Sequence, residues 1–267
     1  MFDEKPFQRF SEYWKRGLKL LEVKGLNRSY GTGPKVLNNI NVQFPDGSFT
    51  IIAGPNGCGK TQLMRHLNGL LKPQTGEVLL DGKNIQKDLM NSRRQIGLVF
   101  QNADSQIVGQ SVASDIAFGA ENLRWPRDVI NRKVESVLQE LSITELKDRR
   151  PHTLSGGEKR RCILAGVLVM DPRIIVLDEP FTGLDQSGVV DVLKDITRLH
   201  HRGKTIILIT HDLEKSLAHC DRLVLMNQGE IKRTGLPRDL LSELEEFGIR
   251  RPWGENRSIE SMTWLKD

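Results

Sequence analysis

Ile51-Ile52-Ala53-Gly54-Pro55-Asn56-Gly57-Cys58-Gly59-Lys60-Thr61 is the segment of this 267-residue chain that says most about its fold. The apolar, β-branched run from Phe49 to Ala53 predicts a buried strand, and leucines at helical spacing up to Pro73 predict a helix after it. Between them, glycines let successive backbone N–H groups point inward at an anion, where the helix dipole favours negative charge. The pattern G-x-x-x-x-G-K-[ST] in this strand–loop–helix setting therefore predicts a nucleotide phosphate loop.

Two side chains at the end of the loop extend this prediction. Lys60 adds positive charge for the phosphates, and Thr61 offers a hydroxyl to Mg²⁺. The loop alone leaves open a kinase, a GTPase, a helicase and a transport ATPase.

Composition sets the broad class. With 38% hydrophobic residues, we expect one domain with a subdomain. Lysine and arginine number 39 against 34 aspartates and glutamates, a mild excess that fits an anionic ligand, a membrane surface or an ordinary solvated surface. Cys58, Cys162 and Cys220 lie far apart and form no C-x-x-C, which favours a reducing compartment over a disulfide framework or zinc site. We find no signal-peptide core, and the longest apolar run, residues 163–170, is too short to span a membrane, so we expect a soluble chain.

The N-terminal extension, residues 1–18, is a separate segment. Aromatic side chains at Phe7, Phe10 and Trp14 follow helical spacing beside basic residues and predict a short amphipathic helix. A membrane or partner contact, a helix folded back on its own domain and a frayed terminus all stay open.

Strands are predicted at Lys19–Val23, Val36–Phe44 and Gly76–Leu80, and again at Ile96–Phe100, which stops at Gln101. A polar amide at the carboxyl end of a buried strand lies where α/β folds bind ligands, so Gln101 is a site candidate.

Tyr30 lies in the loop between the first two predicted strands. Its ring could stack on a nucleotide base or pack on the sheet as a turn tyrosine. After Gln101, the residues from about 103 to 154 follow helical spacing and predict an insertion packed beside the sheet.

A second anion site is predicted at Leu154-Ser155-Gly156-Gly157-Glu158, where Ser155 suits the N-cap of a new helix and the glycines expose backbone N–H groups. One chain cannot easily bring this helix start to phosphates that its own Lys60 holds. A second copy placed head-to-tail could supply it, which indicates a dimer with the ligand at the interface. Both a homodimer and a pair of related ATPase subunits are open.

Two carboxylates follow the aliphatic run at Ile174–Leu177, which predicts a buried parallel strand that ends at the cleft. There, Asp178 would hold Mg²⁺ through water, and Glu179 would orient or deprotonate an attacking water. A further aliphatic strand, Thr205–Thr210, ends at His211 on the same sheet edge. We assign structural roles to the other five histidines, His66, His152, His200, His201 and His219.

Taken in chain order, the phosphate loop, Gln101, the segment 154–158, the two carboxylates, Asp185 and His211 resemble the motifs of the nucleotide-binding subunit of ATP-binding-cassette (ABC) transporters. The resemblance covers about residues 20–240. The resemblance implies an α/β P-loop NTPase with a mostly parallel RecA-like sheet, an antiparallel β subdomain and a helical subdomain at about residues 103–165 within a domain of residues 19–244. The remaining residues 245–267 would form a tail. It also implies two bound ATP molecules in a dimer, with Mg²⁺ near Thr61, Gln101 and Asp178.

Residue roles follow from the same resemblance. Tyr30 would stack on adenine, Glu179 would be the catalytic carboxylate, Gln101 the Q-loop glutamine and His211 the switch histidine. The remaining nucleotide-binding residues of the phosphate loop would be Asn56, Gly57, Cys58, Gly59, Lys60, Thr61 and Gln62. The signature Ser155, Gly156, Gly157 and Glu158 would contact the ATP of the other subunit, and Asp185 would be the D-loop residue.

A narrower resemblance concerns energy-coupling-factor importers, which take up cobalt, nickel or vitamins. The segments Phe100–Gly109, Asp115–Gly119, Glu121–Leu123 and Leu244–Arg250 are similar to those of their ATPase subunits. This implies a transmembrane coupling subunit and a substrate-binding membrane component as partners, no nucleic acid, and a peripheral place on the cytoplasmic face of the membrane. Residues 103–109 would help form the groove that receives the coupling helices.

Three positions depart from the family pattern. Gln62 stands where a hydroxyl residue is usual, Glu158 where glutamine is common, and Cys58 where serine or glycine is frequent. We expect a lowered thiol pKa for Cys58 at its helix start, with alkylation that ATP blocks.

The rival functions are an ATPase of another transporter and a non-transport ABC protein of DNA repair or translation. The long coiled coil, second cassette and zinc-ligand cluster typical of such proteins do not occur in this sequence.

Overall fold

The computed structural model describes residues 19–31, 33–252 and 258–265. The predicted N-terminal helix therefore lies outside the described residues. Six strands form the central sheet in the order β10-β9-β3-β8-β7-β6, and all neighbouring strands are parallel except β10, which is antiparallel to β9. Their bounds are β3 Phe49–Ala53, β6 Ile96–Val99, β7 Ile174–Asp178, β8 Thr205–Thr210, β9 Arg222–Asn227 and β10 Glu230–Gly235.

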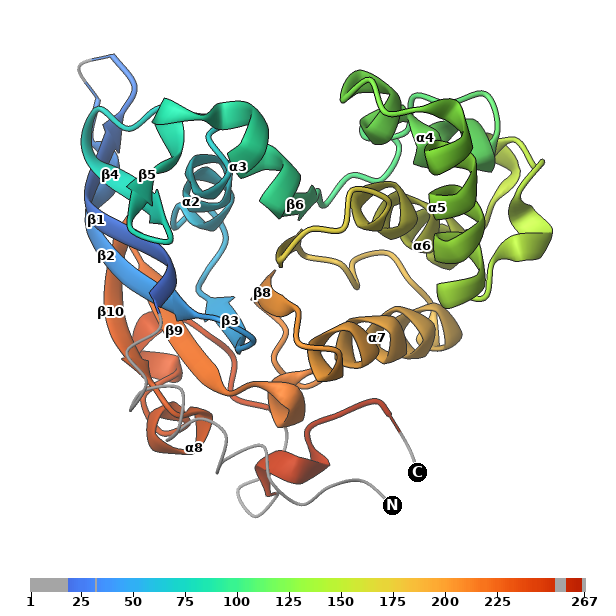
Figure 1. The fold of residues 1–267 in the computed structure, drawn as a ribbon. Helices are drawn as coiled ribbons and strands as arrows, with labels where there is room; N and C mark the ends of the chain where they lie inside the picture. Colours follow the sequence, from blue (N-terminus) through green and yellow to red (C-terminus); the bar gives the residue numbers. More distant parts are fainter. Residues whose placement is uncertain (1–18, 32, 253–257, 266–267) are drawn as a thin grey trace.

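A second, antiparallel sheet has four strands in the order β2-β1-β4-β5. Figure 1 shows it on the left of the molecule, and the helices α4 to α6 on the right. Its strands are β1 Lys19–Ser29, β2 Lys35–Pro45, β4 Thr75–Leu80 and β5 Lys83–Asn84. The predicted fold class, a mostly parallel sheet with an antiparallel β part and a helical part, is thus confirmed.

The helices are α2 Lys60–Leu67, α3 Leu89–Gln95, α4 Val112–Asn122, α5 Arg127–Glu140, α6 Gly156–Leu168, α7 Gln186–His201 and α8 Pro237–Leu240. The helices α4 and α5 both pack on α6, which in turn contacts α7 and β6. None of the helices in the described part of the chain has the length and apolar character that a membrane span requires.

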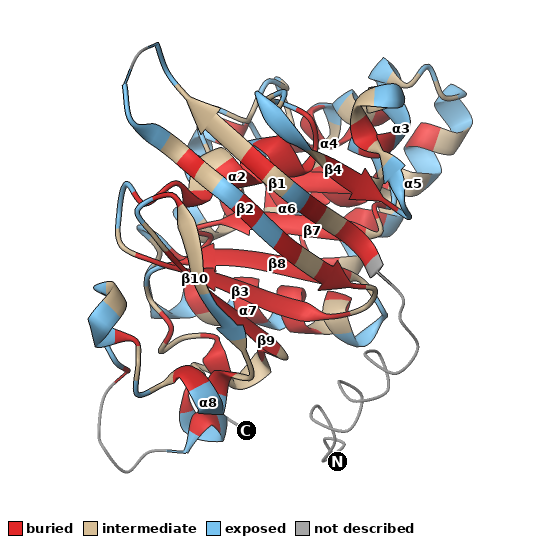
Figure 2. Cartoon of the chain, turned by 90° about the vertical axis from the view of Figure 1, so that its left-hand side faces the viewer, coloured by how far each residue is buried: buried red, intermediate tan, exposed pale blue. Residues whose placement is uncertain are grey.

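Except for the edge strand β10, the strands of the central sheet are buried (Figure 2). Alternate residues of these strands belong to different hydrophobic cores. On β7, Ile175 and Leu177 pack with the helices α4 to α7, whereas Ile174 and Val176 pack with α2 and the antiparallel sheet. A strand covered on both faces can be aliphatic at every position, because neither face meets water. This explains the continuous aliphatic runs before the two predicted carboxylates and before His211.

One predicted strand was too short, and two strands of the central sheet were missed. The first strand does not end at Val23 but continues to Ser29, because Gly25 takes a φ of 56° inside an irregular stretch of the ladder and so forms a bulge rather than a break. The strands β9 and β10 were not predicted, although Gly229, with a φ of 75°, forms the turn between them.

Packing of α6 against β6 depends on a glycine. A Cβ atom added at Gly97 would lie 2.2 Å from Cγ1 of Val167, whereas one added at Gly166 would lie 3.7 Å from its nearest neighbour, the carbonyl oxygen of Asp115. We therefore expect Gly97→Ala to lower the free energy of unfolding by about 1–3 kcal/mol through overpacking. Urea titration followed by circular dichroism measures this change.

Gly166→Ala, on the side of α6 that faces α4, is the matched control. It should leave the free energy of unfolding unchanged or raise it by up to about 1 kcal/mol, since alanine favours a helix. Equal stability of the wild type and Gly97→Ala would contradict the close packing of α6 on β6.

Candidate nucleotide site

The predicted phosphate loop connects β3 to α2, and its backbone requires glycine at several positions. Gly57 and Gly59 have φ values of 79° and 106°, in the left-handed region that side chains disfavour. A Cβ atom at Gly54 would lie 2.1 Å from the carbonyl oxygen of Met226, so β9 approaches the start of the loop closely. Asn56 lies exposed at the tip of the loop.

Lys60 directs its charge into this loop. Its ammonium group is part of a side chain that is only 7% exposed, and it donates hydrogen bonds to the carbonyl oxygens of Gly54 at 2.6 Å and Pro55 at 3.0 Å. Because Lys60 is also the first residue of α2, its positive charge adds to the helix dipole. The loop thus combines two sources of attraction for an anion.

Thr61 and Asp178 come together from α2 and the end of β7. The Thr61 hydroxyl donates to Oδ2 of Asp178 at 2.7 Å. Burial raises the pKa of Asp178, while this hydrogen bond acts in the opposite direction. Hydroxyl and carboxylate oxygens are the hard ligands that Mg²⁺ prefers, so the two residues fit the predicted ion.

The Glu179 side chain is held against the end of β8. Its Oε1 accepts hydrogen bonds from the backbone N–H of His211 at 3.0 Å and from the ring Nδ1 of His211 at 2.6 Å, and its Oε2 accepts from the Thr210 hydroxyl at 3.1 Å. Glu179 itself has a φ of 46°, and its backbone N–H bonds to the carbonyl oxygen of Ile209 at 2.8 Å. Glu179 is only 7% exposed, and its positive φ is held by these hydrogen bonds to the end of β8. The end of β8 therefore fixes the position of the Glu179 carboxylate.

Gln101 follows β6 and is exposed. Within the described residues, its side chain makes no hydrogen bond to Thr61 or Asp178, so its predicted role toward Mg²⁺ stays a prediction. Its backbone carbonyl accepts from Nη2 of Arg160 at 2.8 Å, and the carbonyl of Phe100 accepts from Nη1 at 2.5 Å.

Arg160 was not predicted as a site residue. It is 4% exposed and belongs to α6, so it connects the helix of the predicted signature to the end of β6. Burial lowers the pKa of its guanidinium group, and Asp178 acts in the opposite direction. A signal was present, because Arg160 lies four and seven residues before the apolar positions Leu164 and Val167 and so shares their buried face.

The predicted signature forms a well-capped helix start. The Ser155 hydroxyl accepts from the backbone N–H of Glu158 at 3.3 Å, and Oε2 of Glu158 accepts from the backbone N–H of Ser155 at 2.7 Å. The second bond lowers the pKa of Glu158. Glutamate in place of glutamine therefore serves this capping box equally well. In the same turn, Gly156 is exposed and Gly157 is partly exposed.

Asp185 caps the neighbouring helix α7. Its Oδ1 accepts from the backbone N–H of Gly188 at 2.9 Å, a bond that lowers the pKa of the Asp185 carboxyl. A Cβ atom at Gly157 would lie 3.1 Å from the Cα of Gly188, so the starts of α6 and α7 are in close contact. The structure thus brings the predicted signature and D-loop residue together on one surface.

Tyr30 and Gln62, which are far apart in the sequence, also meet. The Tyr30 hydroxyl donates to Oε1 of Gln62 at 2.8 Å, and the Tyr30 side chain is 49% exposed at the end of the antiparallel sheet. Its ring is therefore not buried on the sheet, as a purely structural turn tyrosine would be.

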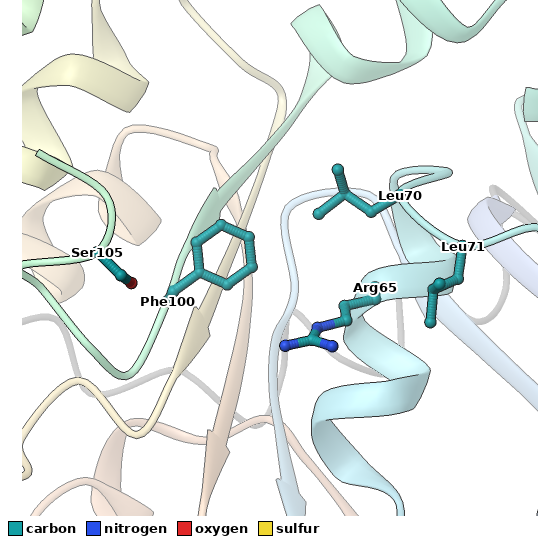
Figure 3. A pocket seen from close by; sticks show the side chains of 5 residues that line it. All are labelled: Arg65, Leu70, Leu71, Phe100 and Ser105. Atoms are coloured by element: carbon teal, nitrogen blue, oxygen red, sulfur yellow. The ribbon is translucent and has the colours of Figure 1, made fainter. Parts of the chain in front are cut away.

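A pocket of about 390 Å³ lies between α2 and the segment after β6. Figure 3 shows Phe100 and Ser105 on one side and Arg65, Leu70 and Leu71 on the other. Gln106 orders this segment, because its side-chain amide accepts from the N–H of Phe100 at 2.9 Å and donates to the carbonyl of Leu98 at 2.8 Å.

The expectation for Cys58 was wrong. Its side chain is only 5% exposed, and burial raises its pKa, which outweighs the opposing effect of Lys60. The helix start alone suggested a reactive thiolate. Burial against neighbouring backbone, visible only in the folded chain, has the larger effect.

Comparison with known proteins agrees with this geometry. A family model described as ABC transporter matches residues 37–182. The chain is 40% identical over 231 residues to the energy-coupling factor transporter ATP-binding protein EcfA of Methanococcus maripaludis, an alignment that covers 85% of this chain and 83% of that protein.

Two solved structures are similar. One is cbiO1 from Clostridium perfringens, part of the ABC transporter complex cbiONQ, with a TM-score of 0.77 and 40% identity over 85% of this chain and 92% of that chain. The other is the dimeric ATP-binding cassette MJ0796 in a post-hydrolysis state with ADP and Pi, with a TM-score of 0.73 and 25% identity over 82% and 99% of the two chains.

Burial of all three cysteines provides a chemical test of the closed loop. Burial also raises the pKa of Cys162 to about 12 and raises the pKa of Cys220. We expect Ellman's reagent at pH 8 to react with the native chain at least about tenfold more slowly than with free cysteine, and with three thiols after denaturation in guanidinium chloride. One fast thiol in the native chain, absent from Cys58→Ala, would show that the loop leaves Cys58 accessible.

Proposed function

Since this chain belongs to the ABC transporter family of ATP-binding proteins, we propose that it is the ATP-hydrolysing subunit of an energy-coupling-factor importer. The observation that carries this proposal is the meeting of Lys60, Thr61, Asp178 and Glu179 at the carboxyl ends of β3 and β7. These residues combine a phosphate-binding loop with two acidic groups. Hydrolysis of a nucleoside triphosphate requires both.

In the proposed reaction, the residues of this chain position the reactants and stabilise charge. Lys60 and the N-terminus of α2 bind the phosphates. Thr61 and Asp178 would hold Mg²⁺, which when bound neutralises charge on the phosphate oxygens. Glu179 orients the attacking water and accepts its proton, and His211 holds the Glu179 carboxylate in place through the 2.6 Å contact.

The proposed active form is a head-to-tail dimer. The capped start of α6 and the adjoining start of α7 present Ser155, Gly156 and Asp185 on one exposed surface. A second copy or a related subunit would receive ATP against this surface, as the dimeric MJ0796 structure supports.

The proposed partners are a transmembrane coupling subunit and a substrate-binding membrane component, at the cytoplasmic face of the membrane. The pocket between α2 and the segment after β6 would receive the coupling subunit. Val108, three residues after the pocket residue Ser105, is 60% exposed and would belong to the same docking surface. Asp115 at the start of α4 holds this segment, because its Oδ1 accepts from the backbone N–H groups of Val108 and Gly109, both at 2.8 Å.

For the cargo, we propose cobalt or nickel ions or a vitamin. The similarity to an energy-coupling factor protein and to a subunit of the cbiONQ complex supports the class of transporter. The choice of cargo comes from the sequence resemblance to importers of cobalt, nickel or vitamins. Uptake of labelled Co²⁺, Ni²⁺ and biotin by cells that express the assembled complex distinguishes these cargoes.

The role of Glu179 can be tested by Glu179→Gln, which keeps the shape of the side chain and removes its basicity. We expect ATP binding to persist and kcat for ATP hydrolysis to fall by about 100-fold or more, because general-base catalysis is lost. Phosphate release measures the rate, and size-exclusion chromatography with ATP should show a trapped dimer.

Glu246→Gln, an exposed glutamate near the C-terminus, is the matched control and should behave as the wild type. Normal turnover by Glu179→Gln would contradict the assignment of Glu179 as the catalytic carboxylate.

The docking surface can be tested by Val108→Glu, which places a charge on an exposed apolar side chain. The isolated chain should hydrolyse ATP at the wild-type rate, whereas its co-purification with the membrane components should fall at least about tenfold, because docking would bury an unpaired charge. Gln139→Glu, which adds the same charge on an exposed position of α5, should assemble normally. Loss of ATP binding in Val108→Glu would show that the segment belongs to the nucleotide site instead.

A further inference from the structure

Gln62 occupies a position where the family pattern has a hydroxyl residue, and the structure gives its side chain a different partner. Gln62 is in the first turn of α2, directly after Thr61, and its backbone carbonyl contacts Nδ1 of His66 at 2.7 Å. Its side chain reaches outward to the antiparallel sheet, where Oε1 accepts the hydrogen bond from the Tyr30 hydroxyl at 2.8 Å. A serine or threonine hydroxyl, two carbon atoms closer to the backbone, would not extend as far.

Tyr30 is held at three points. Its hydroxyl binds Gln62, its backbone carbonyl accepts from the N–H of Gly33 at 3.1 Å, and the guanidinium carbon of Arg28 lies 5.0 Å from the centroid of its ring. Arg28 is itself anchored, because Nη1 donates to the carbonyl of Lys72 at 3.4 Å. A cation over a ring occupies one face and leaves the other face free.

We propose that Gln62 is a positioning residue for nucleotide recognition, which fixes the Tyr30 ring so that its free face meets the adenine base. This inference rests on the proposed function, in which Tyr30 stacks on ATP. An exposed tyrosine without this bond would lose rotamer freedom when the base binds, whereas a ring already held by Gln62 loses less. Gln62 therefore acts on the base through Tyr30, and not on the phosphates.

The test separates the base from the phosphates. Isothermal titration calorimetry on the full chain would give the Kd for ADP and for pyrophosphate, which lacks the base, in Gln62→Ala, Tyr30→Phe and the double variant. Tyr30→Phe keeps the ring and removes only the hydroxyl. We expect each single variant to weaken ADP binding about two- to tenfold, the range for one neutral hydrogen bond.

Two further results are expected if Gln62 acts through Tyr30. The double variant should bind ADP no more weakly than either single variant, because both remove the same interaction. The Kd for pyrophosphate should stay within about twofold of the wild type in all three, and Gln139→Ala on α5 should leave both constants unchanged.

Several outcomes would overturn the proposal. Weaker pyrophosphate binding in Gln62→Ala would show that Gln62 contacts the phosphates, and additive effects or unchanged ADP binding would show that it does not act through Tyr30. Tyr30→Ala tests the underlying assumption, because it should weaken ADP binding more than Tyr30→Phe does. Unchanged ADP affinity in Tyr30→Ala would refute base stacking itself, whereas a loss there with no effect of Gln62→Ala refutes the positioning role alone.

Discussion

The buried pair of carboxylates at the end of β7 constrains the rest of the site. Asp178 and Glu179 are 2% and 7% exposed, and a buried charge is costly unless it is hydrogen-bonded or paired. Asp178 takes its hydrogen bond from Thr61 on α2, and Glu179 takes its hydrogen bonds from Thr210 and His211 at the end of β8. The acid pair thus connects the phosphate loop on one side and His211 on the other to the end of one strand.

The buried guanidinium group of Arg160 connects α6 to the residues that follow β6. Arg160 on α6 binds the carbonyls of Phe100 and Gln101, and Phe100 also lines the pocket proposed for the coupling subunit. The start of the same helix carries the signature that would meet ATP in the partner. In the proposed dimer, a shift of α6 would therefore act directly on the segment proposed to meet the coupling subunit, without a long chain of intermediates.

The C-terminal segment gains its place only from tertiary contacts. Ile259 and Met262 are buried, the Thr263 hydroxyl lies 2.7 Å from Nε2 of His219, and the ammonium group of Lys215 lies 5.1 Å from the Trp264 ring centroid. These contacts fasten the segment to the region that follows His211. Nothing in the spacing of this polar, aromatic tail indicated such a partner, since its apolar residues match neither a helix nor a strand period.

The phosphate loop, the two acids, the capped signature helix and the mixed α/β class could all be predicted from the amino-acid sequence. These features follow from local rules of glycine geometry, side-chain periodicity and helix capping, which a short segment obeys wherever it lies. Three features became visible only in the folded chain: the burial that raises the pKa of Cys58, the bonds of Arg160 to the end of β6, and the contact of Gln62 with Tyr30. Burial and hydrogen-bond partners depend on elements that are distant in the chain, and no local sequence pattern specifies where those elements lie.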